Sequence, residues 1–562
     1  MVEIVGIIVV CILAIAGANQ LAPRLRIAAP LLLVAVGVGV SYLPQTPDIS
    51  VNPEIILVGV LPPLLYASAV ALPAMDFKRD IRAISGLSIT LVIVSALLLG
   101  LFFMWILPDA DYATGVALGA ILSPTDAVAT TTVKRVGAPS RLVTVLSGES
   151  LFNDASALVV LRAAIAAMAA SVSLIGVAVS FVWAIIAAVV VGSVVGWLLL
   201  QIRARVSNVA VATAITFTTP YLAYVPTEYM GASGLVAAVA AGLVTGRGSV
   251  RRLTAAHRQS DQQTWRAVEL LLEGGVFLLM GLELEGLVTD VWLSHETVWH
   301  AVWPAVIAFG LLIVIRWAVV MTQVASMARR TRRMFAKQPM LEDMQTKLGG
   351  AQTPVDRTAR RFQRQIDRRL SDIRYYRAET IGVREGYVVV WAGMRGVVTL
   401  AAAQTLPADT AYRSLLILVA FFVAAGSLVI QGTTLGPVIK MLNLPDNSDE
   451  TRDEQRTLRR QMAAISDEVL NDPSVCGTDG LLARSIEQLR VLEADADFDG
   501  DALDLRLHSA AEMRRVRRVI IARQRVELLN LRDRGAYSSE ALSDALERLD
   551  AEEISIALQG GR

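Results

Sequence analysis

The stretch Ser147-Gly-Glu-Ser-Leu-Phe-Asn-Asp-Ala-Ser156 places several polar side chains inside an otherwise apolar run. A carboxylate in such a run has no water to solvate it unless a pathway reaches it, so Asp154 is a candidate functional residue. At a rise of ~1.5 Å per residue, Glu149 and Asp154 lie ~10 and ~18 Å along this run, near the middle of a bilayer. Ser150 and Asp154 are four residues apart, as are Glu149 and Asn153. The four side chains therefore share one broad helix face.

Two further apolar runs are interrupted by polar or helix-breaking residues. Ser123-Pro124-Thr125-Asp126 interrupts the first, and Gly393-Met394-Arg395-Gly396 the second. Proline removes a backbone donor and glycine weakens a helix, so we expect both spans to be broken. Carbonyls left unpaired at membrane depth are tolerated when they line a cavity or hold an ion. The two spans lie seven apart in the chain, as in inverted repeats with one broken helix in each half, and we expect them to cross.

The composition is that of a polytopic membrane protein with a polar tail. The 562 residues are 54% hydrophobic and 18% charged, and the charges gather between long apolar runs and in the tail. About thirteen runs are near the ~20 residues that a helix needs to cross the hydrocarbon. We therefore predict an all-α fold of about thirteen transmembrane helices, at approximately 4–19, 27–43, 53–73, 85–107, 113–132, 142–169, 173–200, 208–225, 231–246, 265–288, 299–325, 387–408 and 413–440.

Basic residues indicate the topology. Lysines and arginines occupy the gaps after odd-numbered segments, whereas the gaps after even-numbered ones carry only Arg413. This alternation predicts an N-terminus outside and a C-terminus in the cytoplasm. The first segment lacks the basic start and the cleavage site of a signal peptide, so we expect it to remain. The excess of arginine over lysine and the absence of targeting signals favour a plasma (inner) membrane of a bacterium.

Two polar regions flank the last apolar segments. A membrane domain is predicted at 1–442, with a cytoplasmic insert at 327–386, and a helical regulatory domain at 443–562. The arginine-rich insert fits either a solvated helix pair or a surface for anionic lipid. In the tail, the run Asp495-Ala-Asp497-Phe-Asp499-Gly500 begins like a calcium-binding loop, but Arg506 stands where its glutamate should be. An acidic turn between helices is the preferred interpretation.

Several functional classes are disfavoured by missing motifs. The chain has no GxxxxGK[ST] loop, no HExxH and no cysteine/histidine cluster with metal spacing. Cys11 and Cys476 would lie in different environments, so no disulfide framework is expected. The four histidines lie in the gaps, in the tail or, for His300, at the very start of an apolar run, although His257 could tune a cytoplasmic pH response. We expect no cofactor and no nucleic-acid partner.

The central charged residues favour a monovalent cation site that also binds protons. A hard cation such as Na⁺ prefers carboxylate, hydroxyl and carbonyl oxygens. Arg395 needs an acidic partner, for which Glu149 is the first choice and Glu273 the second. Arg162 and Arg316 also lie in apolar runs, and we interpret them as structural residues that extend toward the outer and the cytoplasmic side. A purely structural ion-pair network would explain Glu149 with Arg395, but not Asp154, because four acids exceed one central arginine.

At these residues the chain resembles the monovalent cation:proton antiporter-1 family, the sodium/proton exchangers that include NhaP-type antiporters. The resembling motifs spread over the membrane domain. They are Leu61-Pro-Pro-Leu-Leu-Tyr66, Ala120-Ile-Leu-Ser-Pro-Thr-Asp126, Gly148-Glu-Ser-Leu-Phe-Asn-Asp154, Leu272-Glu-Gly-Gly-Val-Phe-Leu-Leu-Met-Gly281 and Trp391-Ala-Gly-Met-Arg-Gly396.

The resemblance implies an NhaA-like antiporter fold and a homodimer. The dimerisation part would comprise about 1–80 and 205–290, and a moving core about 85–170 and 299–440. By motif, Asp154 would be the titrating ligand with Asn153 and Asp126 beside it, and Ser150 and Thr125 would supply further oxygens to Na⁺. Glu149 would pair with Arg395, and the Asn-Asp form of the motif goes with electroneutral exchange.

The residues and the resemblance together predict a transporter rather than an enzyme. We expect electroneutral Na⁺(Li⁺)/H⁺ antiport that serves intracellular pH and sodium homeostasis. A K⁺/H⁺ antiporter of the same fold and a cation channel remain as alternatives. A carboxylate-binding symporter fits less well, since four central acids suit cations.

Overall fold

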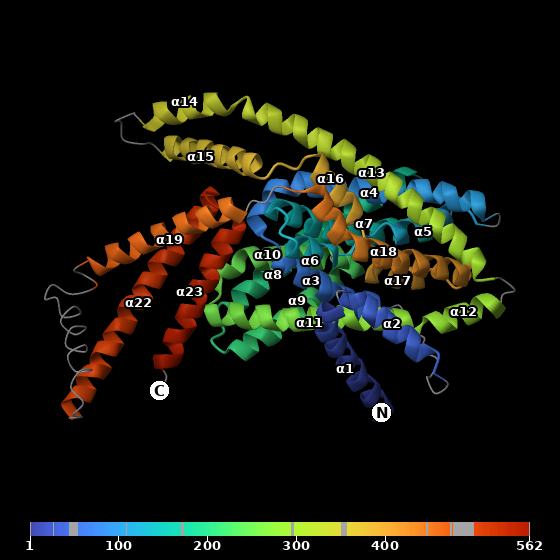
Figure 1. The fold of residues 1–562 in the computed structure, drawn as a ribbon, viewed down its shortest axis with the longest axis horizontal. Helices are drawn as coiled ribbons and strands as arrows, with labels where there is room; N and C mark the ends of the chain where they lie inside the picture. The colour runs from blue at the N-terminus through green and yellow to red at the C-terminus, as the bar shows by residue number, and fades with distance from the viewer. Residues whose placement is uncertain are drawn as a thin grey trace. The chain divides into compact units, whose positions relative to one another are not determined.

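The computed structural model describes residues 2–25, 27–43, 54–107, 110–126, 128–169, 174–293, 297–349, 357–444, 448–472, 475 and 500–560 (Figure 1). These residues form helices and no strand, as the sequence predicts. The helices are α1 (Val2–Leu25), α2 (Ala29–Ser41), the π-helix η1 (Ile55–Val60), α3 (Leu61–Ala71), α4 (Ala74–Ile106), α5 (Tyr112–Leu122), α6 (Val128–Arg135), α7 (Ser140–Ala169), α8 (Leu174–Arg203), α9 (Val209–Tyr229), α10 (Gly234–Arg252), α11 (Ala255–Leu282), α12 (Leu284–Leu293), α13 (Trp299–Phe335), α14 (Gln338–Gly349), α15 (Arg357–Ala378), α16 (Val383–Trp391), α17 (Val397–Gln404), α18 (Arg413–Leu442), α19 (Ser448–Leu470), α22 (Gly500–Arg534) and α23 (Ser539–Gly560).

The chain divides into two compact units. The first contains 1–253, 260–333 and 379–445, and the second contains 254–259, 334–378 and 446–562. The helices of the insert thus group with the C-terminal tail rather than with the membrane domain. The predicted domain boundary at 442 assigns the insert to the membrane domain instead.

Seven described helices are long and apolar enough to cross a membrane by length and composition: α1, α4, α7, α8, α9, α13 and α18. Shorter apolar helices form at Ala29–Ser41, Ile55–Ala71 and Tyr112–Leu122. The predicted apolar runs are thus helical, but the count of thirteen spans is not established by these lengths. The fifth and twelfth runs, for example, divide into helices of 8 to 11 residues, which are too short to cross a membrane individually.

The clearest breaks lie in the two spans that the sequence marks. The fifth run divides into α5 and α6, with a non-helical stretch at 123–126, and the twelfth divides into α16 and α17, with one at 393–396. The backbone N–H of Asp126 donates to the carbonyl of Met394 at 2.7 Å, which joins the two breaks. The prediction of two crossed, broken helices is therefore confirmed.

Packing in the first unit depends on small residues where helix backbones approach closely. On α8, Gly192 and Gly196 are four residues apart and face Ala237 and Ala241 of α10, which have the same spacing. A Cβ added at Gly192 would lie 2.1 Å from the carbonyl oxygen of Ala237. Association of membrane helices through such small residues is common, since lipid offers no hydrophobic driving force.

The second unit contains two helical clusters. In the insert, α14 and α15 form a pair around Leu341, Ile366, Leu370 and Ile373, as the helix-pair interpretation predicts. In the tail, α19, α22 and α23 pack together, and Gln524 donates to the carbonyl of Met462 at 2.9 Å. The start of the calcium-like run, 495–499, and Cys476 lie outside the described residues.

We expect Gly192→Ala to lower the free energy of unfolding by about 1–3 kcal/mol, the usual cost of overpacking. The added methyl group would push α8 away from the Ala237 carbonyl. Unfolding of the detergent-solubilised protein by heat or denaturant measures this change. Gly310→Ala on α13 is the control, because its added Cβ meets no atom within 4 Å. Equal stability of the two variants would contradict the close approach of α8 and α10.

Candidate functional site

The predicted site lies where the two broken spans cross. Pro124 cannot donate a backbone hydrogen bond, and its ring disturbs the preceding turn, so α5 ends at Leu122. In the other span, the two glycines make room for buried charged groups. A Cβ at Gly396 would lie 1.6 Å from Oδ2 of Asp126, and one at Gly393 would lie 2.5 Å from Nε of Arg316. Any larger residue would displace these groups.

Asp126 lies between the N-termini of two half-helices. Its Oδ1 accepts a hydrogen bond from the backbone N–H of Val128, the first residue of α6, at 3.1 Å. Its Oδ2 lies against Gly396, the N-cap of α17. Helix N-termini carry unpaired N–H groups and a partial positive charge. A single carboxylate therefore compensates the positive ends of both half-helices.

Arg395 does the opposite at the C-termini of the other two half-helices. It is 1% exposed, and its guanidinium donates to the carbonyl of Leu122, the last residue of α5, at 3.3 Å. It also donates to the carbonyl of Gly393, just beyond α16. Its backbone N–H donates to Oγ of Ser427 on α18 at 2.9 Å. The C-terminal carbonyls, which have no intrahelical partner, take the role of a counter-charge.

The predicted pair of Glu149 with Arg395 is therefore wrong. Both oxygens of Glu149 accept hydrogen bonds from Arg316 of α13, at 2.6 and 2.8 Å, and both side chains are 1% exposed. Arg316 also donates from Nε to the carbonyl of Val389 on α16 at 3.0 Å. The prediction that Arg316 extends toward the cytoplasm fails for the same reason, because Gly393 leaves space for it inside.

The partners of Arg395 are backbone carbonyls rather than an acidic side chain. Backbone carbonyls at broken helices supply negative charge that composition does not reveal. Glu273, the second predicted partner, is half-buried on α11 and lies within electrostatic range of Asp126 and Glu269. No ion pair joins it to Arg395 in the described ranges. Arg162 pairs with Glu228 of α9 at 2.7 Å and keeps a half-exposed side chain, which agrees with a structural role.

The polar face of α7 contacts the break between α5 and α6. Ser150 donates from Oγ to the carbonyl of Thr125 at 2.6 Å. Asn153 donates from Nδ2 to the carbonyl of Ser123 and to Oγ1 of Thr125, both at 3.3 Å. The Oδ1 atom of Asn153 is buried and has no hydrogen-bond partner among the described residues. The structure thus brings Thr125, Ser150 and Asn153 together. The spacing on α7 predicts that Ser150 and Asn153 share a helix face, and the family resemblance implies the place of Thr125 beside them.

Asp154 differs from the other central acids in its surroundings. It is 8% exposed, and no residue in the described part of the chain donates a hydrogen bond to its carboxylate or forms an ion pair with it. The charged groups that act on it are Asp126 and Glu149, both acidic. Asp126 is compensated by helix ends and Glu149 by Arg316. Among Asp126, Glu149 and Asp154, which lie at the crossing and on α7, the carboxylate of Asp154 is the one whose charge lacks compensation by the described protein groups.

We expect Glu149→Gln to lower the free energy of unfolding by about 3–5 kcal/mol, because it leaves the buried charge of Arg316 uncompensated. Adding Arg316→Met to this variant should restore most of the loss, since both charges are then removed. Denaturant unfolding in detergent measures each step. Further destabilisation by Arg316→Met in the Glu149→Gln background would contradict the pairing.

Comparison with known proteins agrees with this geometry. The family described as "Sodium/hydrogen exchanger, transmembrane" matches residues 8–441. The Na(+)/H(+) exchanger YjcE of Escherichia coli K12 is 28% identical over 97% of both chains. The sodium, potassium, lithium and rubidium/H(+) antiporter of Bacillus subtilis is 29% identical over 51% of this chain and 44% of its own.

The sodium proton antiporter MjNhaP1 of Methanocaldococcus jannaschii shares the fold. Its solved structure matches 78% of this chain and 98% of its own with a TM-score of 0.57 and 18% identity. The family match spans most of the chain and includes every residue of the site described above. The chain therefore belongs to the sodium/hydrogen exchanger family of monovalent cation:proton antiporters and is a multi-pass membrane transporter, not an enzyme.

Proposed function

We propose that this transporter exchanges one Na⁺ or Li⁺ for one proton, and that Asp154 binds the two in turn. One observation carries the proposal: the buried carboxylate of Asp154 has no hydrogen-bond donor and no basic partner among the described residues. A buried charge without compensation is very unfavourable. Uptake of either a cation or a proton removes this cost, so the two compete for one site.

The surrounding oxygens suit a hard monovalent cation. Asp154 would supply a carboxylate oxygen, and Ser150 and Thr125 would add further oxygens from positions that the Ser150 to Thr125 hydrogen bond holds together. The buried Oδ1 of Asn153 is an acceptor without a donor, which favours a nearby cation or water. Asp126 would act through its negative charge, since its carboxylate is engaged by the two helix ends.

The fluxes of cation and proton are coupled if the site can open to the other side of the membrane only when Asp154 has bound one of the two ions. A ligand shifts a conformational equilibrium by its differential affinity for the two states. Here the moving core would be about 85–170 and 299–440, and it would move against a dimerisation part at about 1–80 and 205–290. In support, Thr125 and Asp126 lie in the break between α5 and α6, Arg395 lies in the break between α16 and α17, Ser150, Asn153 and Asp154 lie on α7, and Arg316 lies on α13, all inside that core.

Further features belong to the same proposal. The protein would be a homodimer in the plasma (inner) membrane, with its N-terminus outside and its C-terminus in the cytoplasm, and would serve pH and sodium homeostasis. The arginine-rich insert would face anionic lipid of the inner leaflet. K⁺/H⁺ exchange is the second candidate, because the Bacillus subtilis relative is named for potassium and rubidium as well as sodium and lithium.

We expect Asp154→Asn to abolish Na⁺-induced proton release from acid-loaded proteoliposomes, since an amide cannot alternate between proton and cation. The same vesicles tested with Li⁺ and K⁺ give the ion preference. Asp409→Asn, an exposed aspartate between α17 and α18, is the control and should exchange at the normal rate. Unchanged exchange by a folded Asp154→Asn protein would move the site elsewhere.

We expect exchange to be electroneutral, because one carboxylate carries either one cation or one proton and Asn153 replaces a second acid. In proteoliposomes with a clamped pH gradient, the exchange rate should not vary with an imposed K⁺/valinomycin potential when Na⁺ is the substrate. A rate that follows the voltage would mean unequal charge movement. A sustained current without proton coupling would indicate a channel.

A further inference from the structure

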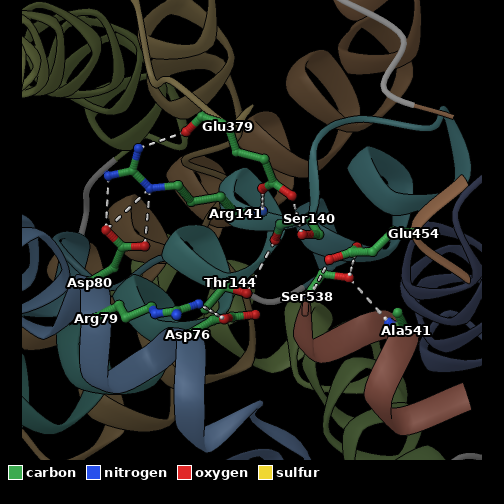
Figure 2. Close-up of polar contacts among 10 residues, drawn as sticks. All are labelled: Asp76, Arg79, Asp80, Ser140, Arg141, Thr144, Glu379, Glu454, Ser538 and Ala541. Carbon is green, nitrogen blue, oxygen red and sulfur yellow. Dashed lines mark hydrogen bonds and ion pairs between the residues drawn. The ribbon is translucent and has the colours of Figure 1, made fainter. Parts of the chain in front are cut away.

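A second, partly buried polar cluster lies at the first turn of α7, 12 or more residues before Asn153 and Asp154 on the same helix. It contains Asp80 of α4, Ser140 and Arg141 of α7, and Glu379, and we call it the α7 clasp. Figure 2 shows these side chains directed toward one another. The guanidinium of Arg141 donates to both oxygens of Asp80, at 2.9 and 3.1 Å, and from Nη1 to the carbonyl of Glu379 at 2.7 Å. Arg141 is 3% and Asp80 2% exposed.

Glu379 caps α7 from a distant part of the chain. Its Oε2 accepts the backbone N–H of Arg141 at 2.5 Å, and its Oε1 accepts Oγ–H of Ser140 at 2.8 Å. The first N–H groups of a helix have no partner within it, and a carboxylate there also compensates the helix dipole. The start of α7 is thus fixed by a residue 238 positions later.

Glu379 lies in the chain between the insert helix α15 and the half-helix α16. Glu379 directly follows α15, the second insert helix, and the division between the two compact units falls between 378 and 379. Two residues before it, Arg377 donates to Gln338 of α14 at 2.8 Å and lies over the ring of Phe335, 5.1 Å from its centroid. After it, α16 begins at Val383 and leads to Arg395.

We propose that the α7 clasp is the joint through which the insert helices α14 and α15 act on the cation site, with Glu379 and Arg141 as positioning residues. Glu379 is attached by the chain to α15 on one side and to α16 on the other, and by hydrogen bonds to α7. A displacement of the insert would move Glu379 and so change how firmly α7 and α16 are held at this end. The cation site would respond because α7 carries Asn153 and Asp154. The effect on Na⁺ exchange rests on the proposed function, whereas the effect of the insert on the first turn of α7 does not.

The test compares three full-length proteins by amide hydrogen exchange of residues 140–146. Ile373→Ala loosens the α14–α15 pair, Glu379→Gln weakens the cap, and the third protein carries both. We expect each single variant to speed exchange in this turn about fivefold or more, and the double variant to add nothing beyond Glu379→Gln. Glu342→Gln, an exposed residue of α14 that accepts a hydrogen bond from Gln338, is the matched control and should leave the turn unchanged.

Additive effects, or no response of residues 140–146 to Ile373→Ala, would overturn the proposal. If Glu379→Gln does not fold, Ser140→Ala removes a single clasp contact and replaces it in the same comparison. Transport gives the second measurement: the folded variants should shift the Na⁺ concentration for half-maximal exchange about fivefold with similar maximal rates. A loss of maximal rate alone would indicate a merely structural cap. Coupled amide exchange in a protein that transports no Na⁺ would refute the proposed function and leave the joint intact.

Discussion

The arrangement of the site depends on one electrostatic problem, the four helix ends that two broken spans leave inside the membrane domain. Two N-termini and two C-termini meet at the crossing, and water cannot pair them as it would at a surface. Asp126 compensates the N-termini of α6 and α17, and Arg395 the C-termini of α5 and α16. The hydrogen bond from Asp126 to Met394 fixes the crossing itself. Other site contacts are built around this pair of charges.

Once the helix ends are compensated, the charge balance of the centre becomes simple. Glu149 and Arg316 neutralise one another and also tie α7, α13 and α16 together, since Arg316 bonds the Val389 carbonyl. Asp154 is then distinguished by its surroundings rather than by its residue type. Under the proposed function, a cation and a proton would exchange at this one carboxylate, while Asp126, Arg395, Glu149 and Arg316 keep their scaffold contacts.

Much of this arrangement could be predicted from the sequence, and the part that could not has a physical reason. The interruptions Ser123-Pro124 and Gly393-Met394-Arg395-Gly396 predict both breaks and their crossing. The spacing on α7 predicts that Ser150 and Asn153 share a face, whereas the place of Thr125 beside them follows from the family resemblance. The partner of Arg395 was missed because backbone carbonyls carry no sequence signal. Arg316 was misjudged because an arginine near a span end resembles one that reaches water. Nor could the link from Glu379 to α7 be predicted, as it joins residues 238 positions apart through a cap.

The two glycines of the second break serve different charges, and this has a consequence for the history of the sequence. A side chain at position 393 would first meet Arg316, whereas one at position 396 would first meet the carboxylate of Asp126. The two positions should therefore drift independently in distant relatives, each in concert with its own charged residue. A descendant that lost Arg316 could accept alanine at 393 and still keep the crossing intact. Paired variation of 316 with 393, and of 126 with 396, would mark how far this architecture extends among sequences too divergent to align by identity.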